Sequence, residues 1–322
     1  MFNRQSRRYD ARQQSLFSGL RLLFGAIWAV NAVLQANAAY VRGFVHSIVV
    51  RIPGQPYLVQ SYLRGAVAVV RGIGGTHVAM LAVGLDAMIA AALLTGIWVR
   101  PAAWLGMIYS LLLWSTVGGF GGPFTTGATD PGTAIVYALV FLCVLVVPSD
   151  ARFRLAGRPR MTGTSGGIET VRVLFGLLWA FDAFWKWQPY FLRHGITLLA
   201  AAEAGQPHWI VAYIGVFASV LGWFGPLIFG VTVALAESAI ALSLLLKRAQ
   251  YLLLPFGAFY SFVLWTTAEG WGGPYRTGAT GNRGDMLGTT NIYVLVFLYL
   301  IVAFLLPAPS RVVTGERSTE VT

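Results

Sequence analysis

Two carboxylic acids lie in the middle of long apolar stretches, where ionisable side chains are rare: Asp86 and Glu237. An ionised carboxylate in hydrocarbon costs about 2.5 kcal/mol or more, so such acids are usually protonated, paired or in contact with water, and usually functional. We therefore predict that both are catalytic residues that carry protons. The alternative is a structural ion pair with Arg21 or Arg172, which lie in the preceding apolar stretches.

A glycine-rich segment from Trp114 to Thr133 carries a second group of polar side chains. Its Gly and Pro residues favour turns. Asp130 and Thr133 precede another apolar stretch, so we expect one of them to cap that helix, whose free N–H groups favour an anion. The alternative is that the segment only plugs the outer end of a helix bundle. The predicted substrate-binding residues are Thr126, Thr129, Asp130, Thr133, Arg276, Thr277, Thr280, Asp285 and Thr289.

These residues come in pairs because the chain contains one unit twice. Residues 114–129 recur as residues 265–280, and the same offset relates Asp86 to Glu237. A constant register through segments of different composition indicates a duplicated and fused structural unit. The predicted domains are two four-helix repeats, a basic cytoplasmic linker and a cytoplasmic tail, over residues 1–148, 168–307, 149–167 and 308–322 respectively.

Composition indicates a membrane protein with several crossings. Hydrophobic residues make up 57% of the chain, charged residues only 11%, and the mean hydropathy is +0.67. Apolar windows that suit a bilayer of about 30 Å are continuous rather than alternating, which favours helices over a barrel. We predict an all-α fold of two parallel four-helix bundles with eight spans, near residues 16–36, 77–98, 102–118, 133–148, 168–188, 226–246, 249–268 and 288–307.

The distribution of Lys and Arg predicts the orientation of these spans. Most basic residues flank one side, which places both termini in the cytoplasm. The first apolar stretch is read as a span, because its counterpart lies in mid-chain, where no signal peptide can occur. Outside, Tyr62–Ile73 and Tyr213–Phe224 are expected to be amphipathic or re-entrant helices. Topology and contact with membrane lipid explain the net charge of +11, so no nucleic-acid partner is predicted.

Four tryptophans repeat at matching positions in the two units. Near the ends of spans tryptophan is usually an interfacial anchor, and the alternative is an aromatic wall for a quinone headgroup. The residues concerned are Trp28, Trp114, Trp179 and Trp265.

Other charges are not shared between the units. Asp182 and Lys186 are predicted to pair within one helix, where the first unit has Asn31 and Gln35. Several arginines on the predicted outer side would attract small anions, and Arg276, with Glu269 beside it, is the best candidate for direct contact. The other arginines of this group are Arg42, Arg51, Arg64, Arg71, Arg193 and Arg283.

The sequence gives no sign of a metal or haem site. Its single cysteine, Cys143, forms no cysteine pair, and its four histidines share no ligand spacing. We predict no metal or haem, and a packing role for Cys143.

The repeated unit resembles the DoxD/DoxX membrane family. The resemblance rests on Trp114, the turn at residues 118–123 and the segment 127–133 that leads into Tyr137. It implies a four-helix unit in a bacterial or archaeal cytoplasmic membrane. It also implies quinone as electron acceptor, thiosulfate or a similar anion as reductant, and either a second subunit of the DoxA type or a homo-oligomer. The chain departs from the family in carrying two units and in its expanded segment 281–289.

Two functions follow as hypotheses. The first is a membrane oxidoreductase subunit, in the manner of thiosulfate:quinone oxidoreductase, that oxidises a small anion at the outer face and reduces quinone. The second is a non-enzymatic transporter, or an assembly partner of a redox complex. Continuous spans without central Gly or Pro weigh against the transporter.

Overall fold

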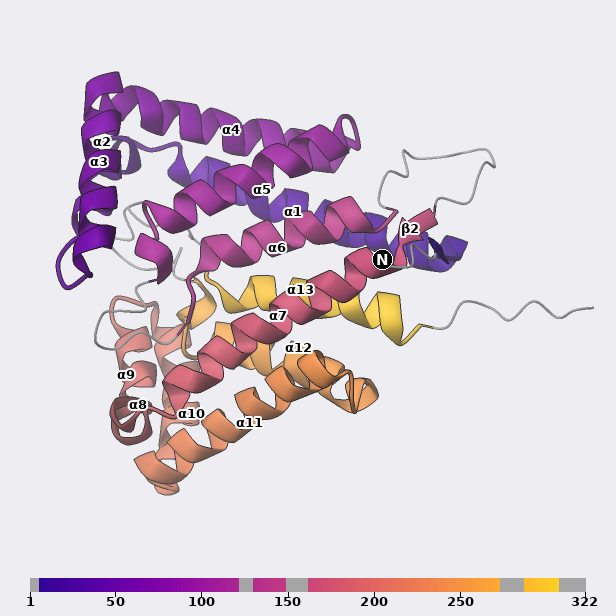
Figure 1. The fold of residues 1–322 in the computed structure, drawn as a ribbon. Coiled ribbons are helices and arrows are strands. Elements are labelled where there is room, and N and C mark those ends of the chain that lie inside the picture. The colour runs from indigo at the N-terminus through magenta and orange to yellow at the C-terminus, as the bar shows by residue number, and fades with distance from the viewer. Residues whose placement is uncertain (1–5, 122–129, 149–161, 273–286, 307–322) are drawn as a thin grey trace, which may run out of the picture.

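The structure, a computed structural model, is almost entirely helical over the residues it describes, which are 6–121, 130–148, 162–272 and 287–306 (Figure 1). Its first half contains α1 (Ala11–Gln35), α2 (Ala38–Val49), α3 (Tyr57–Ile73), α4 (Gly75–Thr95), α5 (Val99–Ser115) and α6 (Thr133–Val146). Its second half contains α7 (Ser165–Lys186), α8 (Pro189–His194), α9 (Thr197–Glu203), α10 (His208–Trp223), α11 (Pro226–Leu246), α12 (Gln250–Thr266) and α13 (Thr290–Phe304).

Three of these helices are long and apolar enough to cross a membrane: α1, α4 and α11. The helices α6, α10 and α13 are apolar but shorter. Many large apolar side chains of the long helices are exposed on the outside, among them Leu81 at 63% and Leu242 at 55%. An exposed apolar surface of this kind needs a partner other than water. By length and composition the described helices indicate a membrane protein.

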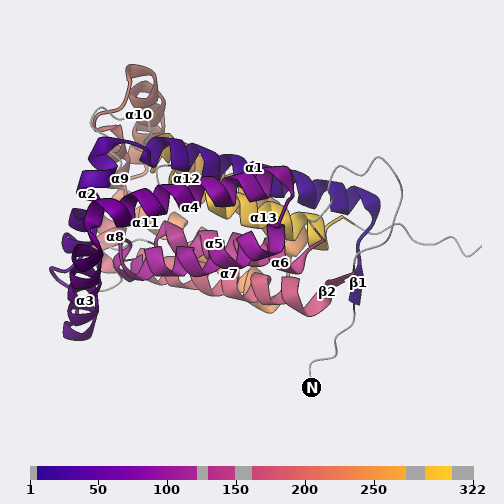
Figure 2. The ribbon, with the colours of Figure 1, turned by 90° about the horizontal axis from the view of Figure 1, so that it is seen from above.

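The short helices gather at one end of the molecule. In Figures 1 and 2, α2, α3, α8, α9 and α10 lie together at one end of the long helices. We call this the cap end. At the opposite end, which we call the ribbon end, β1 (Ser6–Arg8) pairs antiparallel with β2 (Thr162–Thr164), ahead of α1 and α7. The two halves therefore point the same way.

The same hydrogen bonds hold the cap end together in both halves. The Tyr62 hydroxyl lies 2.8 Å from Ser115 Oγ, and the Tyr213 hydroxyl lies 2.8 Å from Thr266 Oγ1. The indole of Trp114 donates to the Pro131 carbonyl at 2.7 Å, and Trp265 donates to the Leu287 carbonyl at 2.7 Å. The tyrosines, their hydroxyl partners and the tryptophans are separated by the offset of the sequence repeat, and the two carbonyl groups lie in the segments that precede α6 and α13.

The turns after α5 and α12 also match. Each turn places one bulky residue in the left-handed region: Phe120 has a φ of 59° and Trp271 has a φ of 60°. Such values cost a non-glycine residue conformational energy. Their occurrence in both halves shows that packing imposes them. The Phe120 ring packs against Trp114 at 5.2 Å, and the Trp271 ring packs against Trp265 at 5.2 Å.

The core of the molecule runs through both halves. The helix α6 packs against α7 and α13, and α13 packs against α1. Each half contributes a buried aromatic cluster of the same four positions, which are Phe24, Trp28, Tyr137 and Phe141 in the first and Phe175, Trp179, Tyr293 and Phe297 in the second.

The segments at the cap end are more helical than expected from sequence. The predicted Tyr62–Ile73 begins five residues earlier as α3, and Tyr213–Phe224 begins at His208 as α10. Sequence reasoning missed α2, α8 and α9. The two halves differ here, because α2 is continuous whereas its counterpart breaks into α8 and α9 around Gly195.

Candidate functional site

The second half encloses a cavity of about 1020 Å³ near the cap end. Its walls are mostly apolar and come from α7 to α13 and from the segment before α6. Phe224 and Ile228 line the cavity and are themselves 50% and 57% exposed, so it opens between α10 and α11. A cavity of this size and lining is typical of sites that bind small amphiphilic molecules.

A buried ion pair lies in the cavity wall. Lys186 Nζ, at the end of α7, is 3.8 Å from Glu237 Oε2 on α11. The Tyr260 hydroxyl, on α12, donates to Glu237 Oε1 at 3.1 Å. The Lys186 ammonium also lies 5.0 Å from the centre of the Phe191 ring, a distance at which the ring face attracts a cation. Three helices thus hold one carboxylate and its counter-ion away from water.

A second carboxylate lines the same cavity. Asp182 lies one turn before Lys186 on α7 and accepts a hydrogen bond of 2.8 Å from the Tyr293 hydroxyl of α13. Asp182 is 3% exposed and Glu237 is 2% exposed. Asp182 Oδ1 and Glu237 Oε2 have no hydrogen-bond partner among the described residues. Buried polar atoms without partners are rare in native proteins and suggest a site for a ligand, water or a proton.

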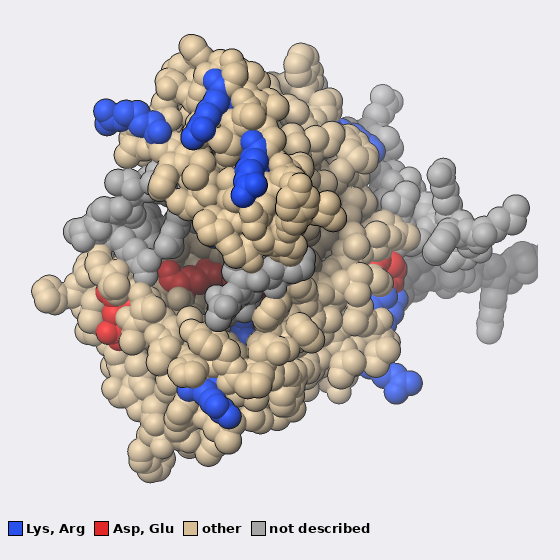
Figure 3. All heavy atoms as spheres, turned by 60° about the vertical axis from the view of Figure 1, so that its left-hand side comes forward, with Lys and Arg blue, Asp and Glu red and all other residues tan. Residues whose placement is uncertain are grey.

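Two further acids line the cavity at its cap-end side. Glu269, in the turn after α12, accepts the backbone N–H of Thr289 at 3.0 Å and of Thr290 at 3.2 Å. Asp130, just before α6, is half-buried and comes from the other half of the chain. Figure 3 shows acidic side chains inside a hollow at this end of the molecule. The described lining of the cavity therefore carries four acids around the single ammonium of Lys186.

The equivalent positions of the first half carry less charge. Asn31 and Gln35 replace Asp182 and Lys186, and Asn31 donates to the Tyr137 hydroxyl at 2.9 Å. Asp86 is 1% exposed and has Tyr109 beside it, as Glu237 has Tyr260.

Tyr40 of α2 is a further difference, because it takes the position of Phe191. Burial raises the pKa of its phenol above the ordinary value, and the nearby Asp86 carboxylate adds to this shift. The first half keeps the fold of the site and one acid, but not the ion pair.

The predicted substrate-binding residues divide into two groups. Thr126, Thr129, Arg276, Thr277, Thr280 and Asp285 lie outside the described residues, as does Arg283. Of the others, Asp130 and Thr289 line the cavity. Thr133 and Thr289 contact each other through their hydroxyl oxygens at 2.5 Å.

The predicted cap of the α6 helix is wrong. Its N-cap residue is Gly132, not Asp130 or Thr133. Asp130 Oδ1 instead accepts the N–H of Gly132 at 2.7 Å, which closes a short turn before the helix. At the start of α13 the first N–H groups are taken by Glu269, so an anion there would have to displace a carboxylate.

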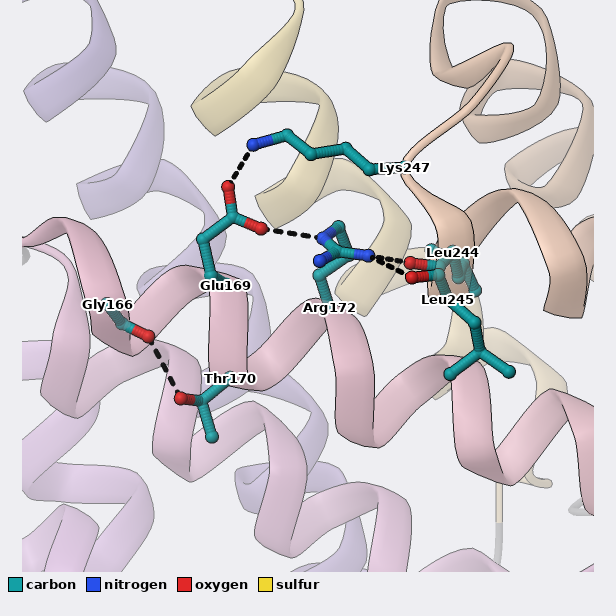
Figure 4. A network of polar contacts seen from close by, with 7 residues as sticks. All are labelled: Gly166, Glu169, Thr170, Arg172, Leu244, Leu245 and Lys247. Carbon is teal, nitrogen blue, oxygen red and sulfur yellow. Dashed lines mark hydrogen bonds and ion pairs between the residues drawn. The ribbon is translucent and has the colours of Figure 1, made fainter. Parts of the chain in front are cut away.

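The predicted ion pairs are also corrected. Glu237 pairs with Lys186, whereas Arg172 contacts Glu169 at 2.7 Å and donates to the Leu244 and Leu245 carbonyls at the end of α11 (Figure 4). Lys247 joins this network through Glu169. Arg172 thus caps the end of α11 at the ribbon end. Arg21, the counterpart of Arg172, lies beside Gly96 at the end of α4, away from Asp86 in the middle of that helix.

The ion pair expected within α7 takes a different form. Lys186 reaches across to Glu237 on α11, and Asp182 takes its hydrogen bond from Tyr293. The Lys186 ammonium still acts electrostatically on Asp182, one turn before it on α7.

The four tryptophans have different surroundings. Trp179 lines the cavity, while its counterpart Trp28 is buried in the first aromatic cluster. Trp114 and Trp265 each donate an indole hydrogen bond to the segment before α6 and before α13, respectively.

The exposed arginines gather on the first half. Arg42, Arg51, Arg64 and Arg71 are exposed on or next to α2 and α3, and Figure 3 shows Lys and Arg side chains on the corresponding lobe. Arg193 is exposed on α8.

Sequence reasoning did not place Tyr260, Tyr293 and Glu269 in the site. The signal for the two tyrosines was present, because Tyr109 and Tyr137 repeat them in the first half. Glu269 has no such signal, since Gly118 stands at its counterpart.

No family model, no curated protein and no solved structure matches this chain. The function is therefore argued from the chemistry of the cavity.

Proposed function

We propose that the chain crosses the cytoplasmic membrane of a bacterium or archaeon eight times, with α1, α4, α5 and α6 as the spans of the first half and α7, α11, α12 and α13 as those of the second. Support comes from the matching order and direction of these helices in the two halves. The ribbon end, with both termini and the basic linker, faces the cytoplasm under the positive-inside rule. The two halves are related by an axis along the membrane normal.

We propose further that this is the membrane subunit of an oxidoreductase, in accord with the DoxD resemblance, and that quinone is its electron acceptor. The observation that carries the proposal is the cavity of the second half. Its wall of apolar side chains opens toward the lipid between α10 and α11, and a buried Lys186 lies at its polar side. A quinone has the same division into an apolar tail and a headgroup with two hydrogen-bond acceptors.

The polar side chains have the roles that quinone reduction requires. The Lys186 ammonium would donate to a headgroup oxygen and stabilise the negative charge that arrives with the electrons. Asp182 would supply one proton, and the Glu237 carboxylate would take up the second proton from the cavity and pass it to the headgroup; a tyrosine holds each of the two side chains in place. Asp86 of the first half lacks a lysine at the position of Lys186, so we assign catalysis to the second half.

The reductant is assigned to the outer loops. Two thiosulfate anions joined by a sulfur–sulfur bond release the two electrons that a quinone accepts. The cavity itself suits an anion poorly, because its described lining has four carboxylic acids and one ammonium. The anion would instead meet Arg276 and the threonines of the outer loops, alone or together with a second subunit of the DoxA type.

The test is thiosulfate-driven reduction of a short-chain ubiquinone by the purified protein in nanodiscs, followed by the loss of quinone absorbance. Lys186→Gln should lower kcat about 10-fold or more, the range for loss of one charge-stabilising donor. Arg64→Gln removes an exposed cation on α3 and should leave the rate within about two-fold, as expected for an exposed surface charge. Wild-type protein that never transfers electrons from thiosulfate to quinone would exclude the proposal.

A further inference from the structure

The cavity of the second half is completed by the first half. Asp130 is the residue outside the second half that lines it, among the described residues. The reason is the packing of α6 against α13, which brings the segment before α6 to the wall of the cavity. The turn closed by Asp130 Oδ1 and the N–H of Gly132 fixes the carboxylate at that place.

Asp130 differs from the other acids of the site in its access to water. It is half-buried at the cap end, whereas Asp182 and Glu237 are almost completely buried. It lines the same cavity as Asp182, Glu237 and Tyr293. It therefore stands between the cap-end surface and the buried acids.

The titratable groups that face this path come from each packed element. They are Asp182 and Lys186 from α7, Glu237 from α11, Tyr260 from α12, Tyr293 from α13, Glu269 from the turn after α12, and Asp130. The described lining from α8, α9 and α10 is apolar. A volume of about 1020 Å³ leaves room for bridging waters, each of which occupies about 30 Å³ in the liquid.

In the opposite direction, aromatic rings pack behind the buried acids. Toward the ribbon end, α7 places Phe175 two turns before Asp182, and its ring packs against Phe297 at 4.8 Å. Trp179 packs against Phe297 at 5.8 Å. All three side chains are buried and apolar at their contacts. Rings packed in this way offer protons a poorer route than the acids and hydroxyl groups that line the cavity.

We propose that protons reach Asp182 and Glu237 from the cap end by way of Asp130, so that quinone reduction takes both protons from that side of the membrane. One quinone gains two electrons from two thiosulfate anions, which join to form tetrathionate, and two protons from the cap-end solution. The quinone step rests on the proposed function, but the proton route does not.

The route can be tested without activity. A hydrophobic carbodiimide modifies a carboxyl group only when it is protonated. The protein, carrying a C-terminal affinity tag after α13, is reconstituted in sealed liposomes that are sorted by the tag, so that the ribbon end faces outward. The pH is then changed on one side only, and modification of the peptide that contains Glu237 is measured by mass spectrometry.

Modification should follow the internal pH, on the cap side, and fall up to about 10-fold for a rise of about one pH unit. It should not respond to the external pH. Modification that follows the external pH would overturn the route. If the expected response occurs in a protein that never reduces quinone, the route stands and the proposed function fails.

Asp130 itself is tested by quinone reduction. Asp130→Asn should lower kcat about 10-fold or more, as for loss of a proton-transfer group, with the KM for quinone unchanged and with recovery in Asp130→Glu. Asp10→Asn is the matched control, because Asp10 caps α1 at the ribbon end and asparagine serves equally well as a cap. An Asp130→Asn variant with the full rate would remove Asp130 from the route.

Discussion

Thr133 and Thr289 occupy equivalent positions in the two halves, and their hydroxyl oxygens lie 2.5 Å apart. Two equivalent residues can touch only where the axis that relates the halves passes between them. The N-termini of α6 and α13 therefore meet on this axis, and their helices form the centre of the molecule. The contact explains how a segment of the first half comes to line the cavity of the second.

Cysteines at these two positions should form a disulfide, because the present oxygen atoms are already close and the bond needs a sulfur separation of about 2.05 Å. In a Cys143→Ser background, Thr133→Cys with Thr289→Cys should keep the halves together after cleavage at a protease site built into the linker. Non-reducing electrophoresis reads the result. Ser110→Cys with Thr289→Cys is the control, and equal cross-linking in both pairs would contradict this arrangement.

Arg172 should matter for stability because it donates to carbonyl groups at the end of α11, which otherwise have no helical partner. Arg172→Gln should lower the free energy of unfolding by about 2 kcal/mol, the range for hydrogen bonds to charged groups. Thermal unfolding in detergent measures the change. Thr170→Ala, on the exposed side of the same helix, should change it by less than about 0.5 kcal/mol. Equal losses of stability in Arg172→Gln and Thr170→Ala would argue against the capping role of Arg172.

Close helix contact should make two glycines intolerant of a side chain. A Cβ at Gly106 would overlap the Phe141 ring, and one at Gly257 would overlap the Phe297 ring. Each Gly→Ala change should therefore destabilise the protein by about 1–3 kcal/mol through overpacking. Gly84→Ala, where no neighbour lies within 4 Å, should be neutral or stabilising. Tolerance of alanine at both crowded sites, seen as an unchanged melting temperature, would refute the packing described for α5 with α6 and α12 with α13.

The buried ion pair predicts that the effects on stability of replacing Lys186 and of replacing Glu237 depend strongly on each other. Lys186→Gln should cost about 3 kcal/mol or more, because it leaves Glu237 buried without its counter-ion. Adding Glu237→Gln should recover most of this loss. Lys247→Gln removes a half-exposed cation paired with Glu169 and should cost less than about 1 kcal/mol. Additive effects of the two cavity substitutions would show that Lys186 and Glu237 do not interact.

Sequence reasoning predicts the long helices well and the site only in outline. The apolar windows locate α4 and α11 to within a few residues, because burial in hydrocarbon demands a continuous apolar run. Asp86 and Glu237 are found for the same reason, because each is a carboxylic acid that interrupts such an apolar run. The partner of Glu237 could not be found in this way. Lys186 reaches it across helices, and sequence spacing reports only neighbours on one helix.

The composite nature of the cavity is also beyond sequence reasoning. Asp130 reads as a helix cap because it stands before an apolar run. Its position in the second half follows from the packing of α6 and α13 on the axis, which no local pattern encodes. The break between α8 and α9 could not be predicted from the sequence either. Gly195 indicates that a helix can end there, but it does not indicate the cavity beside the break.

The central claim, that the cavity of the second half holds a quinone headgroup, is tested most directly by photoaffinity labelling. An azido-quinone is irradiated with the protein in nanodiscs, and the labelled peptides are identified by mass spectrometry with and without excess unmodified quinone. The account predicts label that competes with quinone on α7 near Lys186 and on α10 and α11 near the cavity opening. Equal label at the matching first-half positions, or label that excess quinone does not reduce, would contradict it.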